Sequence, residues 1–351
     1  MPEVLIVGGG IIGCASALAL ATRDAIVTVL ESTTFAARAA STRAAGILGA
    51  QLASHGDAAM LRLCVASRDR YPAWVESLGA DVGYRRSGTL LVAFEPHALV
   101  AKVEAQRRAG LDAQWLDAHA LRELEPSLSD ALAGGAFFAD DGIVDPPRLL
   151  EATRIAAMKA GARFRTEAPV ERVFPGGVQL ADETCLQGDE VVIAAGSWSG
   201  LLDVAPSIEP ARGQMIELRM PEPCVGRVVE GPSAYLSPRA DGRVLVGSTV
   251  ERVGFEEGVT AGAVSSLLRG AIELVPALAG AQLTNTWSGF RAVTPDELPI
   301  LGRAAPGIVI ATGHFRDGIL LAPITADIVA ALIYGEPPPV DLEPFAVSRF
   351  G

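Results

Sequence analysis

The feature that most constrains the fold is a glycine cluster between a short apolar strand and a helix. The apolar run 4–7 predicts the strand, and the alanine-rich residues 11–21 have helical spacing. The six residues 8–13 between and within them, Gly-Gly-Gly-Ile-Ile-Gly, fit the pattern G-x-G-x-x-G. Such glycines permit a tight turn, a close approach of the backbone to a pyrophosphate, and close packing of the helix on the strand. The segment therefore predicts a phosphate site at the start of a helix.

The residues after this helix strengthen that interpretation. A second strand is predicted over 25–30, and Glu31 follows it, eighteen residues after Gly13. A carboxylate at this position can accept hydrogen bonds from an adenosine ribose. No second G-x-G-x-x-G follows a later strand. The sequence thus predicts one bound dinucleotide, and the motif alone leaves FAD and NAD open.

The rest of the chain suggests a discontinuous cofactor domain. At 351 residues the chain exceeds the usual size of one domain. Residues 84–92 are interpreted as a hairpin, and residues 212–250 as antiparallel strands with a turn at Asp241-Gly242. A strand over 307–312 and a helix from Gly318 repeat the strand-turn-helix order of the opening.

We therefore expect an α/β fold, in which a Rossmann-type cofactor domain carries an inserted α+β substrate domain with an antiparallel sheet. A further helix is predicted over 98–109, and another has helical spacing over 148–160 with its start signalled around Asp145-Pro146-Pro147. A further strand is predicted over 190–194. The expected boundaries are 1–80, 140–205 and 285–345 for the cofactor domain, and 81–139 and 206–284 for the substrate domain.

Charge and hydropathy exclude several partners. The net charge is −12 and only two lysines occur, which argues against nucleic acid. The most apolar stretch, 318–335, contains Pro323 and Asp327, so no membrane span is expected. The first residues lead directly into a strand without a basic region, and a cytoplasmic location is expected. The four cysteines are far apart and show no ligand spacing, so we expect no metal site.

Two segments near the C-terminus carry a family resemblance. Residues 287–302 read WSGFRAVTPDELPILG, and residues 311–321 read ATGHFRDGILL. With the opening fingerprint and further matches at 41–46, 142–146 and 195–198, they resemble the D-amino acid oxidase and glycine oxidase family. Within it, the similarity is greatest to the bacterial glycine oxidases of thiamine biosynthesis. The resemblance implies FAD, a glutathione-reductase-like cofactor domain, and oxidation of an amine to an imine.

The resemblance also implies a substrate site. Arg291 matches the family's carboxylate-binding arginine, and Tyr235 matches its substrate-contacting tyrosine; these two are the expected catalytic residues. Arg316 matches a second residue of the glycine oxidase substrate pocket. Without the resemblance, Arg291 and Arg316 would be interpreted as solvated arginines and Tyr235 as a half-buried strand residue.

The same resemblance assigns the cofactor contacts. The segment 313–320 matches the turn around the flavin ring, and Val170 matches an adenine contact. The loop near the reactive edge of the flavin is matched by Ala45, Gly46 and Leu48. The helix from Gly318 would direct its amides at the flavin and stabilise negative charge there. The expected cofactor-binding residues are Gly8, Gly10, Ile11, Ile12, Gly13, Glu31, Ser32, Ser41, Thr42, Ala45, Gly46, Leu48, Val170, Ala195, Gly196, Trp198, Arg291, Gly313, His314, Phe315, Arg316, Asp317, Gly318, Ile319 and Leu320.

His314 and Asp317 of the last motif carry ionisable side chains. His314 is interpreted as a packed side chain, because hydride loss from a neutral amine needs no protein base. Asp317 stands where asparagine is expected in many relatives. A carboxylate beside a reduced, anionic flavin would be unfavourable unless it faces solvent.

The expected reaction is oxidative deamination of glycine, sarcosine or a small D-amino acid, with oxygen reduced to hydrogen peroxide. The imino product would be available for thiazole synthesis in the thiamine pathway. One alternative is a dehydrogenase that passes electrons to a quinone or partner protein, and another is a non-catalytic FAD-binding subunit. Because no cysteine follows Cys224, the covalent flavin of the sarcosine oxidases is not expected, and FAD should be non-covalent. A homo-oligomer is left open.

Overall fold

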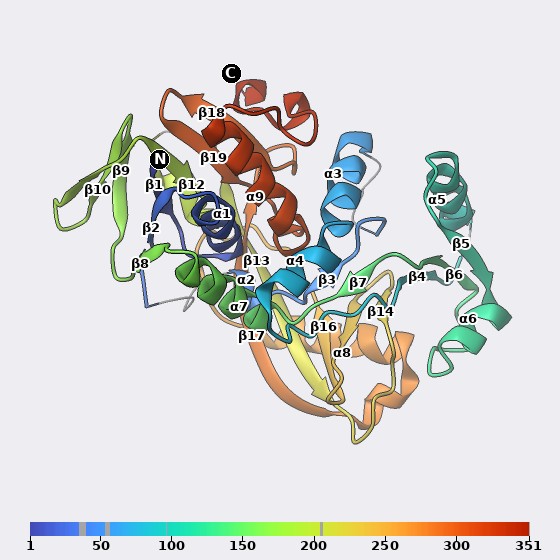
Figure 1. Ribbon diagram of the computed structural model, residues 1–351. Helices are drawn as coiled ribbons and strands as arrows, with labels where there is room; N and C mark the ends of the chain where they lie inside the picture. The colour runs from blue at the N-terminus through green and yellow to red at the C-terminus, as the bar shows by residue number, and fades with distance from the viewer. Residues whose placement is uncertain (35–39, 53–56, 96, 204–205, 351) are drawn as a thin grey trace.

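The computed structural model describes residues 1–34, 40–52, 57–95, 97–203 and 206–350. A six-stranded sheet in strand order β18-β19-β12-β1-β2-β8 forms the centre of one half of the molecule (Figure 1). Its strands run parallel except β18, which is antiparallel to β19. The strands are β1 (Glu3–Val7), β2 (Ile26–Leu30), β8 (Arg163–Arg165), β12 (Glu190–Ile193), β18 (Ile300–Ala305) and β19 (Ile308–Thr312).

Each face of this sheet is covered by a different layer. One face packs against helices α1 (Ile11–Ala21) and α9 (Gly318–Tyr334), and α7 (Pro146–Lys159) lies against α1. The other face packs against a three-stranded sheet of β9 (Val170–Phe174), β10 (Gly177–Leu180) and β11 (Cys185–Gln187). Burial on both faces explains why the central strands are continuous apolar runs.

An eight-stranded sheet forms the other half, in the order β17-β13-β16-β15-β14-β4-β6-β5. Its pairs are antiparallel except β14 with β4. The strands are β4 (Thr89–Ala93), β5 (Gln114–Asp117), β6 (Gly134–Phe138), β13 (Glu209–Arg219), β14 (Val228–Glu230), β15 (Tyr235–Pro238), β16 (Arg243–Gly247) and β17 (Gln282–Val293). One face is covered by helix α8 (Ala261–Leu274), so the opposite face is free to line a cavity.

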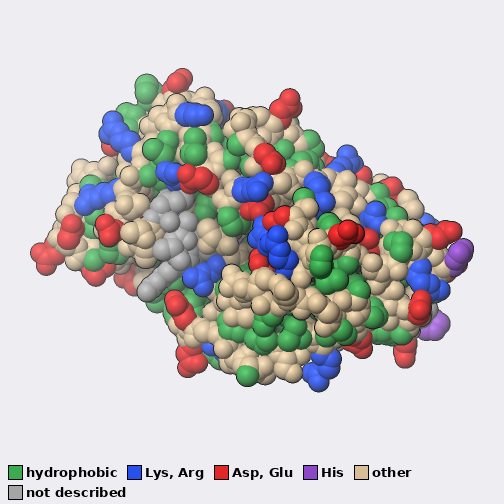
Figure 2. Space-filling view, turned by 90° about the horizontal axis from the view of Figure 1, so that it is seen from below, with side chains coloured by type: hydrophobic (Ala, Val, Ile, Leu, Met, Phe, Trp, Pro, Cys, Tyr) green, Lys and Arg blue, Asp and Glu red, His purple; other side chains and the backbone are tan. Residues whose placement is uncertain are grey.

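Shorter elements join the two halves. Strands β3 (Ile47–Leu48) and β7 (Gly142–Ile143) pair with each other. The remaining helices are α2 (Ala40–Arg43), α3 (Ala58–Arg68), α4 (Tyr71–Leu78), α5 (His97–Arg108) and α6 (Ala118–Leu124). Among the described residues no helix is both long and apolar enough to span a bilayer. Acidic and basic side chains are interspersed over the face shown in Figure 2.

The expected α/β class with an added antiparallel sheet is confirmed, as are the opening βαβ unit, the helix from Gly318 and the hairpin about Asp241-Gly242. Helix α7 begins where predicted, because the Asp145 carboxylate accepts a hydrogen bond from the amide of Arg148 at 3.2 Å. The prediction of a hairpin over 84–92 is wrong. Strand β4 pairs with β6 and β14 instead, so its partners come from distant parts of the chain.

The domain division remains a proposal, with one revision. The expected boundary at 285 cuts through β17, yet β17 pairs with β13 along its whole length. We therefore place the boundary after Val293. The long β17 strand carries the chain from the eight-stranded sheet back toward β18 and β19.

Candidate active site and cofactor pocket

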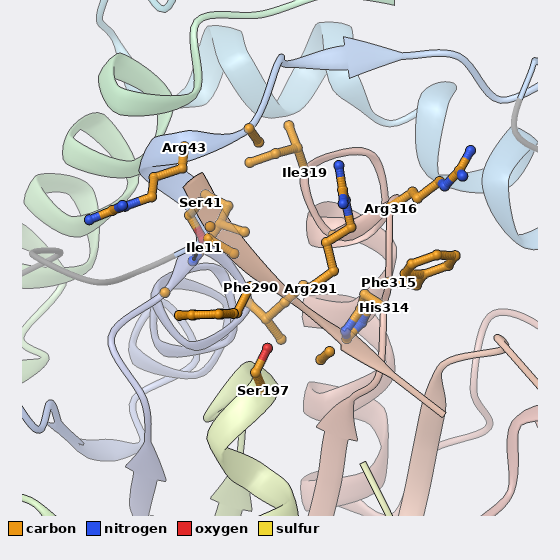
Figure 3. Close-up of a pocket in the computed structure, with 18 of the residues that line it drawn as sticks. Ile11, Ser41, Arg43, Ser197, Phe290, Arg291, His314, Phe315, Arg316 and Ile319 are labelled. Atoms are coloured by element: carbon orange, nitrogen blue, oxygen red, sulfur yellow. Dashed lines mark hydrogen bonds between the residues drawn. The ribbon is translucent and has the colours of Figure 1, made fainter. Parts of the chain in front are cut away.

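A cavity of about 750 Å³ lies between the two sheets. Its lining comes from the carboxyl ends of β1, β2, β12 and β19 on one side and from the free face of the eight-stranded sheet on the other. Carboxyl ends of parallel strands are where open α/β sheets bind ligands. Figure 3 shows part of this lining, with side chains entering from several elements.

The glycines at the start of α1 are sterically required. Gly8 has φ +110°, and a Cβ at this residue would lie 2.5 Å from the carbonyl oxygen of Ala194. A Cβ at Gly13 would lie 2.0 Å from the carbonyl oxygen of Gly8. The first amide of the helix, that of Ile11, donates to Ser41 Oγ at 2.9 Å. The backbone therefore comes close to the cavity at the positive end of a helix, which suits a pyrophosphate.

Glu31 is held in place beside these glycines. Its Oε2 accepts a hydrogen bond from the amide of Gly9 at 2.9 Å, and its Oε1 accepts one from the amide of Thr33 at 3.1 Å. Ser32 and Val170 line the cavity nearby. A fixed carboxylate here suits the ribose of a dinucleotide.

Ser197 supplies an independent sign of a polar ligand. It follows β12, it is buried, and among the described residues its Oγ has no hydrogen-bond partner. In Figure 3 its hydroxyl points into the labelled group of lining residues. Because buried hydroxyls are normally hydrogen-bonded, this atom fits a ligand that carries polar groups, as a dinucleotide does.

The substrate side of the cavity is built by strand register. Paired residues of adjacent strands share a face of the sheet, and one row across it is Glu230, Tyr235, Gly247, Met215 and Trp287. The first four of these residues line the cavity. Their neighbours along the strands, such as Val229 and Leu236, point to the opposite face and pack under α8.

Arg291 lies near the β17 end of this face. Its Nη1 donates to the carbonyl oxygen of Thr249 at 3.0 Å, and its Nη2 donates to Ser248 Oγ at 2.5 Å. A guanidinium has five N–H groups, so these contacts leave donors for a carboxylate. Burial lowers the pKa of Arg291, with a smaller lowering by Arg316 and an opposing effect of Tyr235. A desolvated arginine with free donors is a strong site for an anion.

Glycines make room for both expected catalytic side chains. A Cβ at Gly213 would lie 2.2 Å from Nη1 of Arg291, and one at Gly247 would lie 2.4 Å from the Tyr235 ring. Tyr235 Oη lies 3.7 Å from Met215 Sδ. Arg291 and Tyr235 therefore lie flat over glycines of neighbouring strands, and the sequence analysis missed these glycines because nothing in their local pattern marks them.

The loop at Ala45 is anchored to the eight-stranded sheet. Its carbonyl oxygen accepts hydrogen bonds from Ser237 Oγ at 2.9 Å and Arg239 Nη2 at 2.8 Å. Burial lowers the pKa of Arg239 to about 10, so the side chain remains charged at neutral pH. These two residues hold a cavity-lining loop in position, and they too were missed.

His314 is buried, and its Nε2 lies 3.1 Å from Thr325 Oγ1. Burial lowers its pKa to about 3. The imidazole is therefore neutral at physiological pH and packed on α9, in agreement with its interpretation as a structural side chain.

Asp317 does not face solvent, as a charged carboxylate at this position would need to. It precedes α9, lines the cavity, and is only 8% exposed. Burial raises its pKa to about 7, Arg316 opposes this shift, and Glu230 adds to it. Burial thus favours the neutral acid, which resembles an asparagine in charge and shape.

We expect Asp317→Asn to stabilise the protein increasingly as pH rises from 5 to 8. An acid whose pKa is raised by folding takes up a proton when the protein folds. The stability of the wild-type protein therefore falls as pH rises from the ordinary pKa of an aspartate toward 7. Asparagine does not titrate, so the variant lacks this loss. Thermal unfolding of both proteins across this range measures the difference. A difference in Tm that stays constant with pH would contradict the prediction.

Most expected site residues do line the cavity, including Arg291, Tyr235 and Arg316. Four expected cofactor contacts do not line it: Gly13, Thr42, Leu48 and Leu320. Gly13 permits the turn below the cavity, and Leu48 and Leu320 are buried in the core. Lining residues that the sequence analysis missed include Arg43, Gly49, Leu52, Ser197, Gly213, Met215, Glu230, Gly247, Ser248, Gly289 and Phe290. In the part of the chain that the structure describes, no group of histidine, cysteine and acidic side chains could hold a metal.

Comparison with known proteins matches this geometry to one family. A family model described as FAD dependent oxidoreductase (DAO) matches residues 3–332. The bifunctional protein ThiO/ThiG of Synechocystis sp. is 38% identical over 99% of this chain and 54% of its own length. This chain therefore spans about half the length of such bifunctional relatives.

Relatives of the same length are also found. The glycine oxidase of Geobacillus kaustophilus is 34% identical over 99% of this chain and 97% of its own. A crystal structure of glycine oxidase from that organism matches with a TM-score of 0.95 over 99% of this chain and 98% of that chain. The structure of iminodiacetate oxidase from Chelativorans sp. is 28% identical, with a TM-score of 0.89 over 98% of this chain and 99% of that chain.

Proposed function

Since the chain belongs to the DAO family of FAD-dependent oxidoreductases, we propose that it oxidises the amine of a small amino acid to an imine. The cofactor of this family is FAD, and the required glycines, the fixed Glu31 and the unpartnered Ser197 hydroxyl all suit it. The product imine hydrolyses to an oxo acid and ammonia, or methylamine when the substrate is sarcosine, and oxygen is the proposed electron acceptor.

The observation that carries this proposal is the half-buried Arg291 at the cavity wall. A monoanionic amino acid would place its carboxylate on the free N–H groups of Arg291, through two parallel hydrogen bonds. Tyr235 lies on the same sheet face and would supply a further contact to the carboxylate. An anchored carboxylate limits the positions open to the adjacent α-carbon, which makes the transfer effectively intramolecular.

Bound FAD would supply the hydride acceptor. The protein's part is to bind, orient and exclude water. The turn 313–318 and the amides at the start of α9 line the cavity, and they would stabilise negative charge that develops beside them. His314 is neutral and packed against Thr325, so it is not proposed as a base.

Glycine, sarcosine and a small D-amino acid are the proposed substrates. Support comes from relatives of full length that are named glycine oxidase. We further propose that the imine from glycine supplies thiazole formation for thiamine, because the ThiO/ThiG relatives match this chain over 99% of its length.

The test is the absorbance spectrum of the purified protein, before and after anaerobic addition of glycine, sarcosine or D-alanine. Bleaching of the flavin bands by one of them is expected and would rank the substrates. Bleached enzyme mixed with air in a stopped-flow instrument should recover its colour rapidly if oxygen is the acceptor. A flavin that no amine bleaches would favour a non-catalytic subunit, and slow recovery in air would favour a dehydrogenase.

We also propose that FAD is bound without a covalent link. Neither segment of the C-terminal motif contains a cysteine, and the last cysteine of the chain is Cys224. Acid precipitation should release the flavin into the supernatant. A yellow pellet would contradict this proposal.

A further inference from the structure

Glu230 is a charged residue of the cavity wall to which the proposed mechanism assigns no role. It ends β14 and pairs directly with Tyr235 of β15. Directly paired residues in antiparallel strands lie on the same face with their Cβ atoms about 5 Å apart. The Glu230 side chain therefore lies on the cavity face, one strand beyond Tyr235 and on the side away from Arg291.

The surroundings of Glu230 are charged and only partly solvated. The side chain is half-buried, and none of the described residues donates a hydrogen bond to its carboxylate. Its charged neighbours are Arg316, Lys102 and Asp317. Of these, Lys102 lies on α5 and its Nζ donates to the Leu52 carbonyl oxygen at 3.3 Å, whereas Arg316 and Asp317 line the cavity.

The two lining arginines differ in their surroundings. Arg291 is held by Ser248 and Thr249, with Tyr235 beside it. Arg316 is exposed, stacks on Phe315 at 5.3 Å, and has Glu230 and Asp317 as acidic neighbours. In Figure 3 the side chains of Arg291 and Arg316 point in different directions. The cavity thus has one arginine, Arg291, with N–H groups left to bind an anion, and a second one, Arg316, beside the Glu230 carboxylate.

We propose that Glu230 is a specificity-determining residue, which makes the far end of the amino acid site reject a second carboxylate and so selects monocarboxylic amines. This inference rests on the proposed function, because it assumes that the substrate carboxylate binds Arg291. With Glu230 present, a carboxylate that reaches Arg316 meets a like charge in a partly desolvated site. Without Glu230, Arg316 would be a second anion-binding group.

The sign of the effect follows from electrostatics alone. Two like charges about 5 to 7 Å apart in a protein of effective dielectric constant about 20 repel by more than the energy of a tenfold change in affinity. Neutral substituents on the same substrate feel no such repulsion. Glutamine in place of Glu230 keeps the shape and removes the charge.

The experiment compares holoenzyme with Glu230→Gln on the matched pair sarcosine and iminodiacetate, which differ by a second carboxylate on the nitrogen substituent. We expect the ratio of kcat/KM for iminodiacetate to that for sarcosine to rise roughly tenfold in Glu230→Gln. The double variant Glu230→Gln/Arg316→Met should lose this gain. Glu104→Gln, an exposed acid on α5, removes the same charge away from the cavity and should leave the ratio unchanged.

A second readout does not depend on turnover. Propionate and succinate, titrated into the holoenzyme, should perturb the flavin absorbance. In Glu230→Gln the Kd for succinate should fall relative to the Kd for propionate.

An unchanged ratio in both assays would overturn the role of Glu230, while bleaching by sarcosine would still support the proposed function. A large rise in KM for sarcosine alone would also overturn it, because Glu230 would then bind the substrate amine. If no amine bleaches the flavin, the proposed function fails and the Kd ratio still decides the charge effect.

Discussion

Replacing Arg291 by alanine is expected to raise KM for the amino acid roughly 100-fold or more, because removing one partner of a buried charge pair costs about 3 kcal/mol. The guanidinium is half-buried at the cavity wall and held by Ser248 and Thr249. Arg291→Lys should recover only part of this loss, since a lysine cannot form two parallel hydrogen bonds with a carboxylate. Steady-state kinetics with the substrate that bleaches wild-type flavin measures the effect.

A companion variant tests the placement of the guanidinium. Gly213→Ala leaves Arg291 in the chain, but its new methyl group would lie 2.2 Å from Nη1. The flexible end of the arginine must move, so KM should rise about tenfold or more while flavin content stays normal. Arg291→Ala protein with normal flavin content and an unchanged KM would remove Arg291 from the substrate site.

Replacing Gly13 by alanine is expected to produce protein that is less stable and largely free of flavin. Inside a helix, glycine to alanine normally stabilises by up to about 1 kcal/mol. At Gly13 the added Cβ would lie 2.0 Å from the carbonyl oxygen of Gly8, which is backbone and cannot rotate away. The turn that approaches the pyrophosphate must therefore open, and we expect the flavin content to fall at least about tenfold. The ratio of flavin to protein absorbance and the Tm measure both effects.

The matched control is Gly262→Ala in α8. This helical glycine has no atom within 4 Å of the position of an added Cβ. The same substitution should there leave flavin content unchanged and raise stability slightly. If both variants bind flavin normally, close packing at Gly13 is not required for the cofactor site.

Local sequence signals were sufficient for the elements whose determining residues lie close together in the sequence. The strand, the six-residue glycine pattern, the helix and Glu31 lie within about thirty residues, and the structure shows them in that arrangement. The helix from Gly318 and the turn at Asp241-Gly242 are similarly local. By contrast, the predicted hairpin at 84–92 failed because β4 takes its partners from β6 and β14.

The sequence by itself determined the class of fold and the dinucleotide end of the cavity, because the chemistry there is carried by glycines and an acid at fixed short spacing. Its resemblance to a family added Arg291, Tyr235 and Arg316. Only the tertiary structure decided what surrounds them. The glycines under Arg291 and Tyr235, the buried position of Asp317 and the place of Glu230 depend on register between distant strands. Register across a sheet is set by side-chain packing over the whole sheet, which no local pattern records.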